Sequence, residues 1–160
     1  MRPRRHALLL LLAASLSSVA FPLSAQQSQQ VSAPPAGLTE WRPSTSRVVP
    51  GSAAMLLVGD PGKHELFAAR FRYPSGARLA PHWHTATVNV TVLEGTLMVG
   101  MGDVVDTTRA IAYGPHSFVV FEGGMHHYEW FRGDVVVHVE GVGPFRTIFV
   151  NPADDPRTRP

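Results

Sequence analysis

From residue 38 onward, short apolar runs alternate with clusters of glycine, proline, aspartate and serine. The apolar runs cover residues 54–58, 66–71, 88–93, 96–99, 118–121, 128–131, 135–139 and 147–150. Turn-forming residues separate several of them, at 59–62, 74–76, 94–95 and 132–134. Many short segments at this spacing are typical of an all-β sandwich or barrel, and no long apolar period of 3.6 residues indicates a helix. The pattern therefore predicts one all-β domain with little helix over residues 38–160.

The first 25 residues have a different pattern. An arginine-rich head at residues 2–5 precedes an almost uninterrupted apolar run at 7–21, and small residues follow up to Ala25. This order is that of a secretory signal peptide, and the run is shorter than the roughly 20 residues of a membrane-spanning helix. We expect cleavage near Ala25 and a periplasmic or secreted protein without a membrane anchor. Residues 26–37 are polar and aperiodic, which predicts a flexible leader.

Cleavage of the predicted signal peptide changes the charge of the chain. Three of the 14 lysines and arginines lie in that segment, which leaves 11 basic residues against 12 acidic ones. A nucleic-acid-binding protein usually carries a basic patch, and this sequence has none. The chain has no cysteine, which excludes thiol catalysis, disulfides and thiolate metal sites. Any metal must be held by histidine, carboxylate or water.

Histidines form the densest chemical signal. His82 and His84 are separated by one residue, so in a strand their side chains point to the same face, where two imidazoles can bind one metal ion. Taken alone, this spacing also fits two surface histidines. A second cluster, His126 and His127, follows about 40 residues later. It can supply the third imidazole that a firm metal site needs.

These segments resemble the two conserved motifs of the cupins. Residues 76–95, GARLAPHWHTATVNVTVLEG, resemble the first motif, and residues 116–130, HSFVVFEGGMHHYEW, resemble the second. The matching positions are Gly76, His82, His84, Gly95, Gly124 and His127. The resemblance extends over residues 38–160 and is strongest to small single-domain bacterial cupins.

The resemblance implies an antiparallel jelly-roll β-barrel of the RmlC-like type, with a metal in its mouth. In cupins the motif histidines are metal ligands, which assigns His82, His84 and His127 as ligands and leaves His126 facing outward. The glutamate of the first cupin motif is replaced by Val88, which cannot coordinate a metal. Glu94 lies too far along the strand to take its place, about 33 Å from His84 in an extended chain.

A three-histidine site without a carboxylate remains chemically reasonable, because some cupin dioxygenases hold iron through three histidines. Imidazole suits Fe(II), which we favour, and also zinc, manganese, nickel or copper. Three neutral ligands leave the charge of a divalent ion uncompensated, which favours an anionic ligand or substrate. The alternative is a degenerate cupin that no longer holds metal firmly.

Three further residues are candidate catalytic groups. Glu129 shares the strand face of His127, where it could act as an outer hydrogen-bond acceptor or a general base; the alternative is a carboxylate at the solvent-facing rim. His138 and Glu140 alternate with valines in a late strand. They line the barrel beside the metal if this polar face points inward, and they are surface residues if it points outward; the period alone does not decide.

Three functions are consistent with this sequence. The first is a metal-dependent, dioxygenase-type oxidoreductase acting on a small anionic substrate. The second is a non-catalytic cupin module that binds a small molecule or a metal, and the third is a metal-free structural cupin. A small-molecule ligand and a second copy of the chain, in a homodimer, are the expected partners. The substrate stays open because one fold hosts many chemistries.

Overall fold

The computed structural model describes residues 40–45 and 47–158. The predicted signal peptide, residues 1–25, and the predicted leader, residues 26–37, lie outside this part of the chain. Over the described residues, no helix has the length and hydropathy needed to cross a membrane.

The described residues form β-strands and two short 3₁₀ turns, with no α-helix among them. The strands are β1 Arg42–Pro43, β2 Ala53–Val58, β3 Leu66–Tyr73, β4 Arg78–His84, β5 Val88–Met101, β6 Ile111–Tyr113, β7 Phe118–Phe121, β8 His127–Val142 and β9 Thr147–Phe149. The 3₁₀ turns are η1 Pro152–Asp154 and η2 Pro156–Thr158. Every strand pairing is antiparallel. The predicted all-β class with little helix is confirmed.

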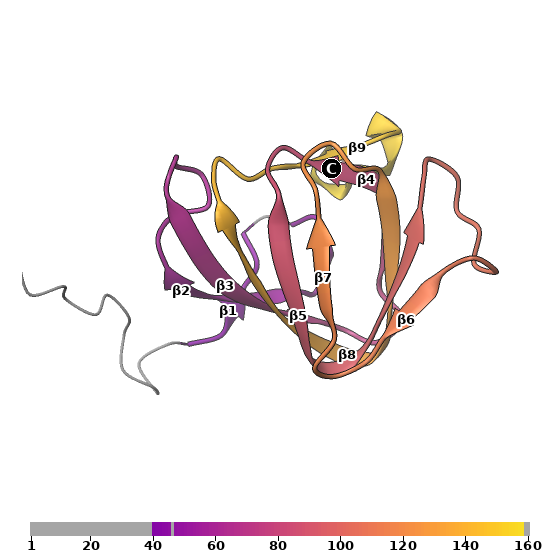
Figure 1. The fold of residues 1–160 in the computed structure, drawn as a ribbon, viewed down its shortest axis with the longest axis horizontal. Coiled ribbons are helices and arrows are strands. Elements are labelled where there is room, and N and C mark those ends of the chain that lie inside the picture. Colours follow the sequence, from indigo (N-terminus) through magenta and orange to yellow (C-terminus); the bar gives the residue numbers. More distant parts are fainter. Residues whose placement is uncertain (1–39, 46, 159–160) are drawn as a thin grey trace, which may run out of the picture. The chain divides into compact units, whose positions relative to one another are not determined.

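The long strand β8 connects the two halves of the sheet. Along one edge it pairs with β5, and along the other it pairs first with β4 and then with β3. The sheet order is β1-β2-β3-β8-β4-β9, and β5 also pairs with β6 and β7. Figure 1 shows these strands curling around a common interior. The sequence therefore forms a curled antiparallel sheet, as predicted.

Two predicted turns are instead bulges inside long strands. Residues 94–95 lie within β5 and residues 132–134 within β8, where the register between the two strands shifts. Gly95 and Gly133 both have a φ of 72°, a conformation that glycine adopts without steric cost. A Cβ on Gly95 would lie 2.4 Å from the carbonyl oxygen of Asp134, so the two bulges pack directly against each other. Each pair of predicted short strands is therefore one bent strand, and the prediction of a chain reversal at these positions is wrong.

The interior is filled by alternate residues of the strands. On β5 and β8 these are mostly valines, as expected for a half-buried pleated surface. The buried core consists of Val49, Phe67, Leu79, Val88, Val90, Val92, Leu97, Val99, Phe121, Phe131, Val135, Val137, Val139 and Phe149. This apolar interior surrounds the side chains that form the candidate site.

Candidate metal centre

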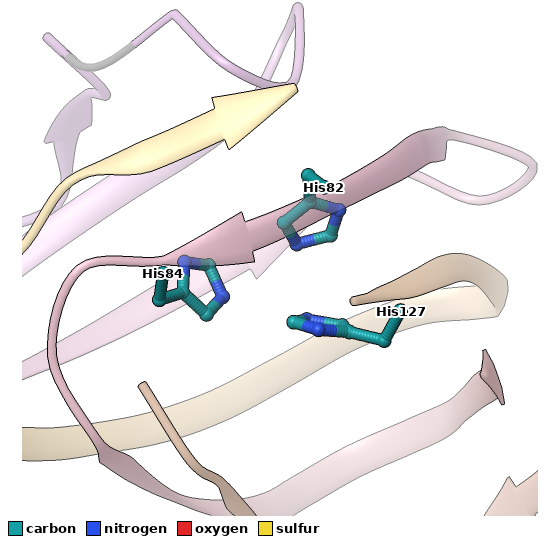
Figure 2. Close-up of side chains that lie close together, drawn as sticks. All are labelled: His82, His84 and His127. Atoms are coloured by element: carbon teal, nitrogen blue, oxygen red, sulfur yellow. The ribbon is translucent and has the colours of Figure 1, made fainter. Parts of the chain in front are cut away.

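Three buried histidines converge from two strands. His82 and His84 lie near the end of β4, and His127 begins β8 as the cross-strand partner of His82. The ring centroids of His82 and His127 are 4.2 Å apart, and His84 lies 5.0 Å from each. One ring nitrogen of each residue lies within 4.8 Å of the others. Figure 2 shows the three rings turned toward one another, so the structure brings together the three residues that the motifs assign as ligands.

The local backbone orients two of these rings. Pairing between β4 and β8 is irregular between Leu79 and His82, where Pro81 lacks the N–H that a ladder needs. The Nδ1 of His82 lies 2.8 Å from the carbonyl oxygen of Ala80, and the Nδ1 of His127 lies 2.9 Å from that of Met125. A carbonyl can only accept, so both Nδ1 atoms donate and both Nε2 atoms keep their lone pairs.

These Nε2 atoms fit a metal ion. In the described part of the chain, the Nε2 atoms of His82 and His127 are buried and have no hydrogen-bond partner. Buried polar groups are nearly always satisfied, and ligand histidines typically donate their other ring nitrogen to a backbone carbonyl or a carboxylate. Two orphaned acceptors beside a third imidazole are the arrangement that a divalent cation satisfies. The three-histidine group can therefore hold a divalent metal.

Burial keeps the three imidazoles neutral. It lowers the pKa of His82 to about 3 and that of His84 to about 2, with a smaller effect from the neighbouring imidazoles. Burial also lowers the pKa of His127 to about 4, although its hydrogen bond to Met125 opposes the shift. Metal binding needs the deprotonated ring. The site is therefore in its metal-binding form at neutral pH without having to release protons.

Phenylalanines surround the histidine cluster. Phe121 stacks on His127 with a centroid distance of 4.2 Å, Phe145 lies 4.8 Å from His84, and Phe149 lies 6.0 Å from His82. An apolar shell of this kind controls solvent access and the local dielectric around a metal. Sequence analysis did not identify these rings, because they come from segments that only the tertiary fold brings together.

A cavity of about 450 Å³ adjoins the cluster. His84 borders it, together with Phe121, Phe145 and the apolar residues of the inward strand faces. Val88 is 1% exposed and also lines this cavity. The position that carries a glutamate in the cupin motif thus faces the space beside the histidines.

No family model matches this chain, and no curated protein matches its sequence. Among solved structures, the polyketide cyclase RemF from Streptomyces resistomycificus is 18% identical, with a TM-score of 0.60 over 74% of this chain and 84% of that chain. A cupin-2 domain from Rhodospirillum rubrum is 15% identical, with a TM-score of 0.53 over 72% of this chain and 78% of that chain. This chain has the cupin fold. An acetylacetone dioxygenase from Acinetobacter johnsonii is also similar, at 17% identity and a TM-score of 0.54 over 71% of this chain and 74% of that chain.

The two adjacent histidines of the second cupin motif point in different directions. His127 is 0% exposed and belongs to the cluster. The side chain of His126 is 40% exposed, pairs with Asp103 and stacks beside Trp83. The structure thus places His126 on the outer side of the sheet, away from the candidate ligands.

His138 and Glu140 do not line the cavity. Their neighbours Val137 and Val139 are buried and border the cavity, so the alternating pleat of β8 points the polar pair to the outer face. There the His138 Nε2 lies 3.5 Å from a carboxylate oxygen of Glu140. Of the two alternatives for this pair, the structure shows the outward one: the valines take the inward positions because their burial is favourable.

Glu129, by contrast, lies on the cavity side of β8. It borders the cavity together with Phe131 and Tyr73. Burial raises the pKa of the Glu129 carboxyl to about 8, and burial together with Glu129 raises the pKa of the Tyr73 phenol. The structure thus places Glu129 on the same strand face as His127. The cavity also has the hydroxyl group of Tyr73, which sequence analysis did not single out.

The raised pKa of Glu129 predicts a pH-dependent stability. Between the ordinary glutamate pKa of 4.5 and about 8, the folded metal-free protein holds a proton that the unfolded chain releases, so stability falls as pH rises. From pH about 6.5 to about 8 we expect the free energy of unfolding of wild type to fall by about 1–2 kcal/mol relative to that of Glu129→Gln. The same relative fall should appear in Glu140→Gln, which alters the outer face of the same strand. Urea unfolding at the two pH values measures it.

The histidines have the opposite effect, in a lower pH range. Their pKa values are lowered on folding, so they reduce stability as pH falls below about 6.5, where unfolded histidines take up protons. The histidines contribute equally to wild type and to Glu129→Gln, so the difference between these two proteins isolates Glu129. Equal pH dependence of wild type and Glu129→Gln would show that another group causes the fall.

Proposed function

We propose that this protein is a mononuclear metalloenzyme of the dioxygenase type that acts on a small anionic substrate. The observation that carries the proposal is the cluster of three buried imidazoles, two with orphaned Nε2 atoms, beside a cavity in a cupin fold. His82, His84 and His127 would hold a divalent metal, with Fe(II) favoured. When bound, such a metal supplies Lewis-acid and redox chemistry at the cavity wall. The similarity to an acetylacetone dioxygenase supports this choice among cupin activities.

The charges around the cavity support an anionic substrate. Three neutral imidazoles do not compensate a divalent charge, so an anion beside them is favoured. Arg146 and Arg157 border the cavity. Arg157 is engaged by both carboxylate oxygens of Asp155, at 2.7 and 2.8 Å, whereas Arg146 is exposed at the rim. We infer that Arg146 attracts the substrate anion toward the histidine cluster.

Metal analysis and oxygen uptake test the proposed function. Protein purified from its native export pathway should contain about one divalent metal per chain, because His82, His84 and His127 form one cluster. After anaerobic loading with Fe(II), we expect substrate-dependent oxygen consumption with small β-dicarbonyl or carboxylate compounds. Stoichiometric metal without oxygen uptake would favour the non-catalytic binding module. Absence of metal would favour the metal-free structural cupin.

We also propose that the protein works outside the cytoplasm, as the residue pattern of the first 25 positions indicates. The mature chain should begin near Gln26 and be recovered from the periplasm or the medium. N-terminal sequencing of the purified native protein measures this. A chain that retains Met1 in a membrane fraction would contradict export as a cleaved protein.

A further inference from the structure

The cavity wall contains one carboxyl group without a partner. Most of the strand residues that border the cavity are aliphatic or aromatic. Glu129 is the exception on β8, where it lies between His127 and Phe131 on the inward face. Among the described residues, no hydrogen bond or ion pair is found for its side chain, and the residue is partly exposed. Glu129 therefore offers a carboxyl group to the cavity that it borders.

The other carboxylate that borders the cavity differs in this respect. An oxygen of Asp60 accepts a hydrogen bond from the backbone N–H of Gly62 at 2.8 Å, and the other lies 3.4 Å from the ammonium group of Lys63. These contacts satisfy Asp60 within the protein. Glu129 has no equivalent partners among the described residues. Its carboxyl group is therefore available to a donor on a ligand in the cavity that it borders.

Tyr73 places a second polar group in the same region. Its ring stacks on Phe131, with centroids 4.3 Å apart and planes at 13°. The phenol and Glu129 both border the cavity. An O–H donor and a carboxyl acceptor thus lie on a mostly apolar wall, the pattern by which binding pockets orient a ligand.

The distance along the strand links this region to the histidines. His127 and Glu129 are two residues apart on one face of β8, about 7 Å in an extended strand. A ligand the size of one aromatic ring can therefore contact Glu129 while it lies beside the cluster. The cavity of about 450 Å³ has room for such a ligand.

We propose that Glu129 determines ligand specificity by accepting a hydrogen bond from a hydroxyl or amino group on a ring-sized ligand. The inference deepens the proposed function and rests on it only in treating this cavity as the substrate site. It needs neither a bound metal nor oxygen chemistry. The test of this inference can therefore fail while the proposed function holds. The proposed function can likewise fail while this inference holds.

Phenol and toluene, which differ by a hydroxyl in place of a methyl group, are suitable probes. Calorimetric titration of the metal-free full chain gives a dissociation constant for each. We expect Glu129→Met to shift the toluene-to-phenol ratio of dissociation constants at least about threefold toward toluene, the effect of one lost hydrogen bond between uncharged groups. The control Glu140→Met, on the outer face of β8, should leave the ratio unchanged. If Glu129→Met does not fold, Glu129→Leu is judged by the same criterion.

Three results would overturn the proposal. A ratio that shifts less than about threefold in the Glu129 variant assigns hydroxyl recognition to another group. A wild-type preference for phenol that exists only after zinc loading assigns it to the metal. Failure of wild type to bind either compound shows that the cavity does not take a ring-sized ligand.

Discussion

Each of the substitutions His82→Ala, His84→Ala and His127→Ala should remove stoichiometric metal from the purified protein. The His126→Ala variant should retain its metal. Each of the three contributes one nitrogen to a group whose candidate ligand atoms lie within 4.8 Å of one another, and two remaining imidazoles rarely hold a metal firmly. Elemental analysis of the purified variants measures the loss. The metal-linked gain in unfolding free energy, about 2.7 kcal/mol at a metal concentration 100 times the dissociation constant, should disappear together with the metal.

His126→Ala is the matched control, because it changes the same residue type at the adjacent position. Its side chain is half exposed and engaged by Asp103, so its loss should leave the cluster intact. Melting curves of all four variants without metal show whether any loss of metal merely reflects unfolding. If His126→Ala loses metal and His127→Ala keeps it, the ligand assignment in the second motif is wrong by one residue.

The protein should lose its metal only at a pH well below that at which an exposed histidine site does. Protons compete with a metal for imidazole nitrogens, and an exposed histidine site loses its metal near the ordinary pKa of 6.5. Burial lowers the pKa of His82, His84 and His127 to about 3, 2 and 4. We therefore expect the protein to retain metal at pH about 5 while it stays folded. Dialysis at graded pH followed by metal analysis measures this, and release near pH 6.5 would contradict a buried cluster.

The clustering of the candidate ligands could be predicted in part from the sequence because strand parity is local. His82 and His84 share a face whichever way the strand turns, and the motif register selected His127 over His126. Whether a strand face points into the barrel or to solvent cannot be determined from the residues of that strand alone. For His138 and Glu140 it depends on Val137 and Val139 being buried against other strands. Similarly, Gly95 and Gly133 indicate a change of backbone direction, but whether it is a reversal or a bulge depends on how β5 and β8 pair along their whole length.

The cavity and its surroundings were beyond prediction for a related reason. Phe121, Phe145 and Tyr73 lie on separate segments, and none has a distinctive local pattern. Glu129 could be placed on the His127 face from its parity. Its raised pKa and its lack of partners depend on which side chains enclose it. Periodicity thus predicts which residues are neighbours on one strand, while the chemistry of the site depends on neighbours across strands.

Val88→Glu should strengthen metal binding and weaken the metal-free protein. Val88 is 1% exposed, lines the cavity that His84 also borders, and pairs across strands with Phe121, whose ring stacks on His127. A carboxylate here adds an anion that a divalent charge stabilises. Without metal it is an unpaired polar group among apolar residues, which should lower the free energy of unfolding by about 1–3 kcal/mol. Binding of anionic chelators to the metal should weaken, because the new carboxylate partly neutralises the charge that attracts them.

Val90→Glu is the matched control for this substitution. Val90 is 5% exposed and lines the same cavity from the next inward position of β5, but it pairs with Val119 and Val139 rather than with Phe121. Both variants should lose stability without metal. On metal addition, only Val88→Glu should gain more free energy of unfolding than wild type does. The additional gain is about 1.4 kcal/mol for each tenfold increase in metal affinity. Melting curves with and without metal measure the gain. Two results would show that Val88 does not face the metal. One is an equal metal-linked gain in stability for Val90→Glu, and the other is a gain for Val88→Glu no larger than that of wild type.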